Sequence, residues 1–391
     1  MSAREHFEIE ADWVHVVFNE DSPVREVYGF TGAQGRINLE GVRFRPRGRP
    51  SRTLLIYMHP ASTLELLPVP RAMAAAGAHV LCAGSRYARN DAPLIMEKVV
   101  VDCGAYVRHA KEVWDYDKVV LAGWSGGGSL AVFYQSQAER PTITQTPAGD
   151  PVEMAGLVRG DGIIFHAAHL SRAEVLCEFI DPSVLDEHDP SIRDPELDLY
   201  DRRNPNRPPY SAEFLAHFRS AQLARVRRRT AWVKEVLATI RARRSQESER
   251  AILTHCTMAE PRFLDATIDP NDRAIGTCFL GDPRSANHSP AGVARYSTLR
   301  AWLSQWSIDD SQALALRNVR NVTAPLLVIE NSADDAVPQP HTRMLFEASS
   351  SPDRQFECIK GANHYYAGQP DQLQEAVAVV FEWMQGRRLI D

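Results

Sequence analysis

The fold is decided by a nine-residue stretch in the first half of the chain, Val119-Val120-Leu121-Ala122-Gly123-Trp124-Ser125-Gly126-Gly127. Its apolar start predicts a buried strand, and the residues from Ser129 to Glu139 predict a helix after it. A serine at the tip of such a strand–turn–helix unit has a strained backbone, so the positions two before and two after it must lack bulk. Gly123 and Gly127 meet that requirement. The stretch therefore predicts an exposed serine nucleophile, with the positive end of the following helix directed at it.

Length and composition favour a soluble protein with a large core. The chain has 391 residues, of which 44% are hydrophobic, and a formal net charge of −6, which argues against a nucleic-acid partner. The segment from Met1 to Trp13 is charged and lacks the apolar centre of a signal peptide, and no apolar run approaches membrane-spanning length. The six cysteines show no C-x-x-C spacing, so we expect reduced thiols, no metal site and a cytoplasmic location.

In the first half of the chain, apolar runs alternate with helix-like segments, which is the pattern of a parallel sheet. Four such runs lie at 54–58, 79–83, 119–122 and 162–166. They are apolar throughout rather than alternating, which is typical of strands covered by helices on both faces. We therefore predict an α/β fold with a mostly parallel central sheet. Two short strands are also expected ahead of these runs, at 14–18 and 42–45.

This alternation of strands and helices stops at about residue 170 and resumes after residue 322. The intervening region has little strand character, and its expected helices lie at 211–229, 231–247 and 297–305. Two further strands are expected at 325–330 and 355–359. We therefore predict a core domain of residues 1–169 and 323–391, interrupted by a mainly helical insertion of residues 170–322.

The insertion also contains a cluster of basic residues, which would be one way to bind an anionic partner. Its members are Arg225, Arg227, Arg228, Arg229, Arg241, Arg243 and Arg244. Apolar residues at helical spacing interrupt the cluster, so we interpret it as the solvated face of a helix.

Two late loops carry the residues that a serine nucleophile requires. A serine hydroxyl needs a base, and the base needs an orienting carboxylate. In the chain order Ser…Asp…His, the acid follows a late strand and the histidine follows the last one. Asp334 and Asp335 follow the first of the two late strands, and His364 follows the second. Taken singly they read as turn formers and a surface histidine; together, behind Ser125, they predict a catalytic triad.

The turn Gly123-Trp124-Ser125-Gly126-Gly127, the late acid and the loop Gly361-Ala362-Asn363-His364 together resemble the α/β-hydrolase family. In that family the acid commonly precedes a Val-Pro pair, with two residues between the acid and the valine. This pattern maps onto Asp334, ahead of Val337-Pro338. The resemblance therefore implies Asp334, rather than Asp335, as the partner of the histidine.

The resemblance covers about residues 50–168 and 323–391. It does not cover the middle of the chain, which matches no subfamily known to us. The family often inserts a cap at this place, so the resemblance implies that residues 170–322 shield the nucleophile from water and supply most substrate contacts.

Stabilising an oxyanion takes two preorganised donors. One is expected from the N–H of Gly126, directly after the nucleophile. The family commonly carries His-Gly-X after the strand at 54–58, with X donating, whereas this sequence has His59-Pro60-Ala61. Proline has no N–H, so the resemblance implies Ala61 as the second donor. His59 is expected to orient the loop by hydrogen bonding, in contact with the substrate site.

Three further residues are candidates for contact with substrate. Arg86 follows the carboxyl end of a strand, the side on which α/β sheets bind ligands, and would suit a substrate carboxylate. A structural ion pair of Arg86 with Asp91 or Glu97 is the simpler interpretation. Trp124 beside the nucleophile either lines the pocket or packs under it, and Tyr365 directly follows the histidine.

These residues predict a serine hydrolase that cleaves a carboxylic ester of a small organic substrate through an acyl-enzyme. Two other functions stay open: hydrolysis of a carbon–carbon bond in a β-diketone-like substrate, and a hydrolase-fold receptor with slow turnover. No metal or organic cofactor is expected, since the sequence has neither H-E-x-x-H nor a suitably placed G-x-G-x-x-G. Nucleic-acid and membrane partners are not expected, and a homodimer is left open.

Overall fold

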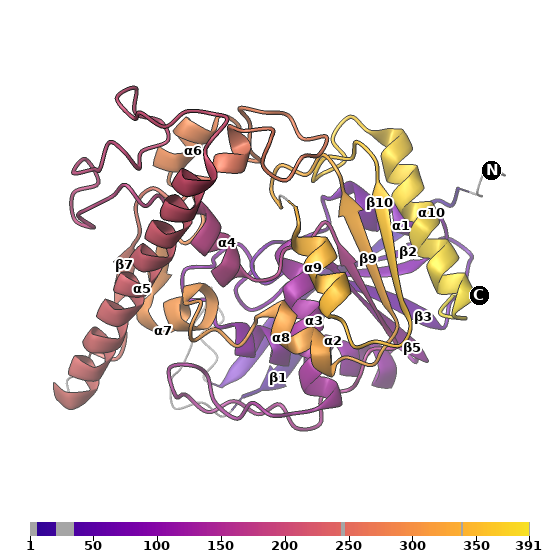
Figure 1. Ribbon diagram of the computed structural model, residues 1–391. Coiled ribbons are helices and arrows are strands. Elements are labelled where there is room, and N and C mark those ends of the chain that lie inside the picture. Colours follow the sequence, from indigo (N-terminus) through magenta and orange to yellow (C-terminus); the bar gives the residue numbers. More distant parts are fainter. Residues whose placement is uncertain (1–5, 21–34, 244–246, 338, 391) are drawn as a thin grey trace.

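The computed structural model describes residues 6–20, 35–243, 247–337 and 339–390, and these form one eight-stranded sheet in the order β1-β2-β4-β3-β5-β6-β9-β10 (Figure 1). The strands are β1 (Ile9–Asn19), β2 (Arg36–Pro46), β3 (Thr53–Met58), β4 (His79–Ala83), β5 (Lys118–Trp124), β6 (Gly162–His166), β9 (Leu326–Asn331) and β10 (Arg354–Ile359). From β4 to β10 the neighbours pair in parallel, which confirms the predicted sheet. β1 and β2 join one edge antiparallel and are longer than the sequence indicated.

Helices cover both faces of the sheet, as the apolar strands predict. The covering helices are α1 (Pro68–Ala75), α2 (Met96–Glu112), α3 (Gly126–Glu139), α9 (His341–Ala348) and α10 (Pro370–Gly386). Along β3, Leu54 and Ile56 pack with residues of α2 and α3, whereas Leu55 and Tyr57 pack with residues of α1 and α10. Alternate side chains thus enter two separate apolar layers, and both layers are buried.

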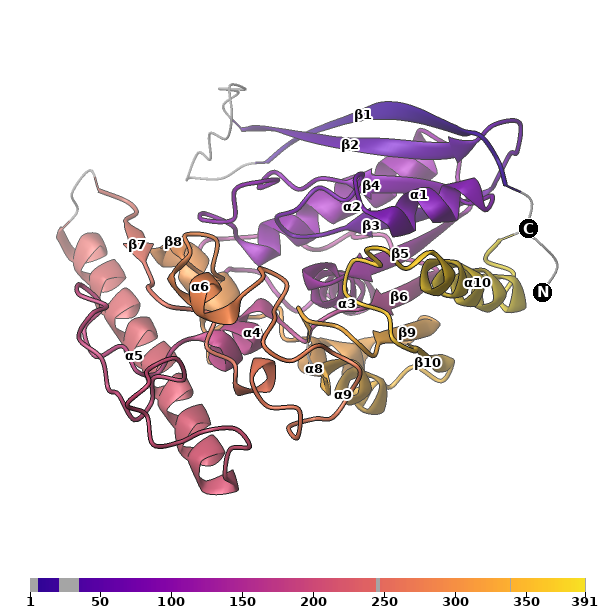
Figure 2. The same cartoon turned by 90° about the horizontal axis from the view of Figure 1, so that it is seen from above.

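The segment between β6 and β9 adds no strand to this sheet within the described residues. It contains α4 (Arg172–Phe179), α5 (Ala212–Arg243), β7 (Ala251–Leu253), η2 (Pro261–Phe263), α6 (Pro283–His288), β8 (Tyr296–Thr298), α7 (Leu299–Ala301), η3 (Trp302–Trp306), α8 (Ala315–Asn318) and η4 (Val319–Asn321). Figure 2 shows α5 standing apart from the sheet, with α4 between them. One continuous α5 replaces the two helices expected at 211–229 and 231–247.

Two details of this segment differ from the sequence-based expectations. β7 and β8 form a small antiparallel pair where little strand character was expected. The helix expected at 297–305 is a short α-helical turn that continues as the π-helix η3. Its two tryptophans, Trp302 and Trp306, are fully buried, so packing of large rings dominates this part of the chain.

The basic cluster is not uniformly a solvated face. Arg227 and Arg228 are exposed, as expected, but Arg225 is fully buried and Arg229 nearly so. Arg225 makes two hydrogen bonds of 2.8 Å to the carboxylate of Glu187 and a third to the backbone oxygen of His255. A loop of the same insertion folds back over this side of α5, which the helical spacing alone does not reveal.

No helix in the described part of the chain combines the length and the apolar character needed to cross a membrane.

Candidate active site

Ser125 sits at the sharp turn between β5 and α3, with φ 54° and ψ −125°. A side chain on Gly123 would place its Cβ 2.3 Å from the backbone oxygen of Gly127, and one on Gly127 would place it 2.2 Å from that of Met58. Both contacts are impossible, so the close approach of strand, turn and helix requires glycine at each position. The strained serine and its two flanking glycines have the geometry that the sequence motif predicted.

The structure pairs His364 with Asp334. The Nδ1 atom of His364 lies 2.9 Å from Oδ2 of Asp334, and both side chains are almost completely buried. The second carboxylate oxygen, Oδ1, accepts the N–H groups of Ala336 and Val337 at 2.8 and 2.7 Å. Asp334 is therefore fixed by the loop that follows it, with one oxygen directed at the imidazole. Pro338, the second residue of the family's Val-Pro pair, lies outside the described residues.

Asp335 makes no such contact within the described residues. Burial raises the pKa of its carboxyl group, and the neighbouring carboxylate of Asp334 raises it further. Its backbone oxygen accepts the N–H of Phe279 at 3.2 Å. The choice of Asp334 over Asp335 thus agrees with the geometry of the histidine.

Two aromatic rings hold the imidazole of His364 in place. The indole of Trp124 lies 4.4 Å from it between ring centroids, and its Nε1–H donates to the backbone oxygen of His364 at 3.3 Å. The ring of Tyr365 stands edge-on at 4.8 Å. Trp124 and Tyr365 both also line the cavity described next, so Trp124 both contacts this cavity and packs against the histidine.

Ser125 and His364 line one cavity of about 350 Å³. The core contributes these two residues together with His59, Trp124 and Tyr365. The insertion contributes part of α4, the segment 290–296 and Trp306. The cavity therefore lies at the carboxyl edge of the sheet, where the turns after β3, β5, β6, β9 and β10 meet the insertion.

The side chain of His59 lines the cavity beside the turn that carries Ser125. Its Nδ1 accepts the N–H groups of Ala61 and Ser62, at 3.1 and 2.9 Å, so the ring proton lies on Nε2. A Cβ added to Gly126 would lie 2.7 Å from that Nε2 atom. Burial, and the nearby charges of Arg172 and His364, lower the pKa of His59 to about 3, so the ring is neutral at ordinary pH. It is therefore a neutral N–H donor beside the nucleophile.

This geometry corrects the expectation for Ala61. Its N–H points back to Nδ1 of His59 rather than into the cavity. The N–H of Gly126, the first of α3, has no hydrogen-bond partner among the described residues, so it is available as a donor. The side chain of His59, and not the backbone of Ala61, therefore faces the cavity.

No protein-family model and no curated protein matches the chain. Comparison with solved structures does give matches, and these agree with the architecture described above. The solved structure of DcsB in complex with its substrate analogue aligns over 96% of this chain and 99% of that one, with a TM-score of 0.50 and 12% identity. Combined with the strand order and the serine turn after β5, this match decides the fold. The chain has the α/β-hydrolase fold.

Weaker matches are found to other solved structures. Est1E from Butyrivibrio proteoclasticus has 13% identity and a TM-score of 0.47, over 90% of this chain and 94% of that one. An alpha/beta hydrolase superfamily protein from Enterococcus faecalis has 12% identity and a TM-score of 0.40, over 89% and 95%.

Sequence reasoning missed two histidines near the active-site cavity of this α/β-hydrolase fold. His166 ends β6, and its Nε2 lies 2.6 Å from the hydroxyl of Tyr366. His169 lines the cavity, and its Nε2 would lie 3.3 Å from a Cβ on Gly126. Burial lowers the pKa of both, so both are neutral. Their position at and just after the carboxyl end of β6, the neighbour of β5 in the sheet, was the signal that could have found them.

Arg86 is not part of the cavity, which corrects its assignment as a substrate contact. Its guanidinium is buried and pairs with Asp102 of α2, at 2.7 Å, and with Glu20 after β1, at 2.5 Å. Arg86 does form structural ion pairs, as the simpler interpretation expected, but the expected partners, Asp91 or Glu97, were wrong. These two residues are engaged elsewhere, Asp91 by Arg172 and Glu97 by Ser304.

No group of three or more histidine, cysteine, aspartate or glutamate side chains able to hold a metal ion is found in the described ranges of the chain.

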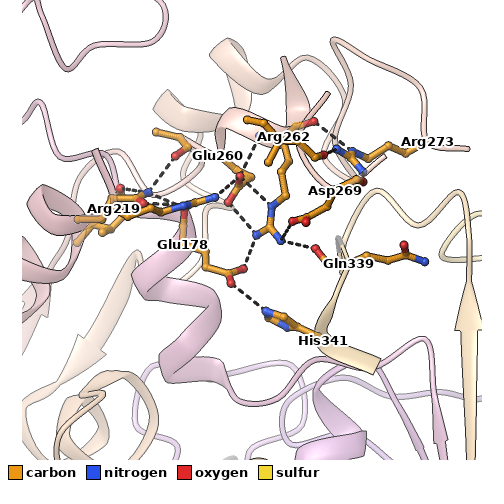
Figure 3. A network of polar contacts seen from close by, with 12 residues as sticks. Glu178, Arg219, Glu260, Arg262, Asp269, Arg273, Gln339 and His341 are labelled. Carbon is orange, nitrogen blue, oxygen red and sulfur yellow. Dashed lines mark hydrogen bonds and ion pairs between the residues drawn. The ribbon is translucent and has the colours of Figure 1, made fainter. Parts of the chain in front are cut away.

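A buried ionic network ties the insertion to the loop that carries the acid (Figure 3). Arg262 donates to Glu260 at 3.0 Å and to Glu178 at 2.6 Å, and its Nη1 donates to the backbone oxygen of Gln339 at 2.6 Å. Glu178 in turn lies 2.9 Å from Nε2 of His341. These contacts hold the pKa of Glu178 well below its usual range. Because Gln339 and His341 follow Asp334 closely, the insertion and the acid loop form one connected unit.

Arg262→Met is therefore expected to lower the free energy of unfolding by about 3 kcal/mol, because it removes the charged hydrogen bonds of Arg262 and leaves Glu260 with Arg219 and Glu178 with His341 as their remaining partners. Urea unfolding measures the loss. The matched control is Arg227→Met, whose partner Asp309 lies in an exposed pair at 2.9 Å and which should cost no more than about 1 kcal/mol. Equal losses in the two variants would show that the network does not stabilise the fold.

Proposed function

We propose that the protein is a serine hydrolase that cleaves carboxylic esters, or related acyl bonds, of small organic substrates. The observation that carries the proposal is the shared cavity. A strained serine, Ser125, and a histidine paired with a carboxylate, His364 with Asp334, open onto it together. These are the groups that acyl transfer through a serine requires.

The proposed reaction begins when Ser125 attacks the ester carbonyl while His364 takes the hydroxyl proton. Asp334 keeps the proton of the neutral imidazole on Nδ1 and stabilises the imidazolium that forms. The N–H of Gly126 and the Nε2–H of His59 stabilise the oxyanion. His364 returns the proton to the leaving alcohol, and a water that it then deprotonates releases the acid and restores the serine.

In this proposal residues 170–322 act as a cap. Arg172, Phe179, Arg295 and Trp306 of this segment line the cavity together with the residues of the core. Closing a site in this way excludes bulk water and shapes the space available to the substrate.

The decisive test combines labelling and turnover. A fluorophosphonate probe should label the wild type and Ser62→Ala, another serine of the same cavity whose backbone contact to His59 is retained, but not Ser125→Ala. Only the labelled proteins should hydrolyse p-nitrophenyl esters of graded chain length. Labelling of Ser125→Ala would refute the assignment. Folded wild type that is not labelled would indicate a binding protein, and turnover of vinylogous diketones alone would indicate carbon–carbon hydrolysis.

A further inference from the structure

The charged groups of the cavity do not balance. Two guanidinium groups line it, those of Arg172 and Arg295, and one carboxylate, that of Asp91. Arg172 donates to Asp91 and lies over the ring of Trp306, 4.4 Å from its centroid. The charge of Arg172 is thus neutralised by Asp91, whereas that of Arg295 is not.

Arg295 is the cation that has no carboxylate partner among the described residues. Its side chain belongs to the segment 290–296 and is 6% exposed. Nη2 donates to the backbone oxygen of Asn287 at 3.1 Å, while the buried Nε atom has no partner in the described structure. Burial lowers the pKa of Arg295 and the charge of Arg225 lowers it further, whereas Cys256 and Tyr296 raise it.

The other groups around the cavity cannot supply the missing negative charge. His59 and His169 are neutral, because burial lowers the pKa of each. A buried guanidinium without an anion is costly, and its planar fork matches a carboxylate closely. An anionic group bound in the cavity would remove that cost.

We propose that the substrate is an ester that also bears a carboxylate, which Arg295 binds while the ester carbonyl lies at Ser125. The inference rests on the proposed function and specifies the substrate class of the same site. One unpaired guanidinium matches the single charge of a carboxylate, whereas a phosphate dianion would leave one negative charge without a partner in this lining.

The test uses two matched pairs of esters, because the carboxylate can belong to either half of the substrate. On the acyl side, mono-4-nitrophenyl glutarate is compared with 4-nitrophenyl valerate. On the alcohol side, 4-acetoxybenzoate is compared with 4-acetoxybenzamide. In at least one pair the wild type should show the higher kcat/KM for the charged member.

Arg295→Gln should lower the ratio of charged to neutral kcat/KM in the preferred pair by about thirty-fold or more, since it removes one partner of a buried charge pair. Arg295→Lys should restore part of the ratio. Arg284→Gln, an exposed arginine of α6, removes the same charge outside the cavity and should leave the ratio unchanged.

Each outcome bears on one of the two proposals. A wild type that labels with fluorophosphonate and hydrolyses esters, but prefers the charged member of neither pair, would overturn the inference and leave the proposed function standing. A ratio that is the same in Arg295→Gln and the wild type would overturn it as well. Absence of both labelling and ester turnover would instead refute the proposed function. The wild-type preference needs no variant, so misfolding of Arg295→Gln cannot hide the result.

Discussion

Asp334→Asn is expected to lower kcat for p-nitrophenyl esters by about 10⁴-fold. In the native site, Nδ1–H of His364 donates to Oδ2 of Asp334 at 2.9 Å, which leaves Nε2 free to accept the serine proton. An asparagine amide donates where the carboxylate accepts, so the imidazole would take the opposite tautomer. It would then present an N–H, and no lone pair, to Ser125.

Asp335→Asn is the matched control, because the same chemical change is made one residue away. Asp335 has no hydrogen bond to His364 among the described residues, so this variant should keep most of its turnover. Its folded-state pKa is raised, so ionised Asp335 destabilises the fold above that pKa. Removing the charge should therefore raise the urea midpoint at pH 8. A larger loss of kcat in Asp335→Asn than in Asp334→Asn would show that the acid was assigned to the wrong neighbour.

Much of this architecture could be predicted from the sequence, because it depends on burial that is local to each strand. A parallel strand covered on both faces must be apolar along its whole length. The apolar runs in the sequence therefore predicted β3, β4, β5 and β6. The position of Ser125 follows from glycines that no other residue could replace at such close approaches. Asp334, Asp335 and His364 follow as candidates from their place in loops at one edge of the sheet, and the choice of Asp334 follows from the resemblance to the α/β-hydrolase family.

Other features depend on contacts between distant parts of the chain. The partners proposed for Arg86 were Asp91 and Glu97, whereas the structure uses Asp102, which lies beyond Glu97 in the same helix α2, and Glu20 after β1. Likewise, helical spacing shows which side chains of α5 share a face. It does not show that Glu187 covers the part of that face that holds Arg225.

Our proposal of His59 as the second oxyanion donor could not be made from the sequence, because it depends on the direction of one N–H group. The presence of Pro60 correctly excluded one donor, but the next N–H, of Ala61, points either into the cavity or back to His59 according to the turn of the loop. The same turn of the loop makes Nδ1 of His59 an acceptor, so the proton of the ring lies on Nε2. The sequence therefore identifies the loop, and the structure shows the direction of the Ala61 N–H, on which our proposal of His59 as the donor rests.

His59→Asn is expected to lower kcat by about 10²–10³-fold, the usual effect of losing one oxyanion donor. The asparagine oxygen can replace Nδ1 as acceptor for the N–H groups of Ala61 and Ser62, so the loop should keep its shape and KM should change little. What this variant lacks is the distal N–H beside Gly126. Because the pKa of His59 is lowered to about 3, its donor is present throughout the assay range, and the loss should be the same at every pH from about 5 to 9.

His59→Gln makes the complementary change, since its longer amide reaches the position of Nε2 with an N–H but leaves the loop without its acceptor. A donor role predicts that the glutamine variant keeps more kcat than the asparagine variant while unfolding at a lower urea concentration. A role confined to orienting the loop predicts the reverse order of kcat. Near-wild-type kcat in His59→Asn would return the second donor to the backbone, with Ala61 reoriented when substrate binds.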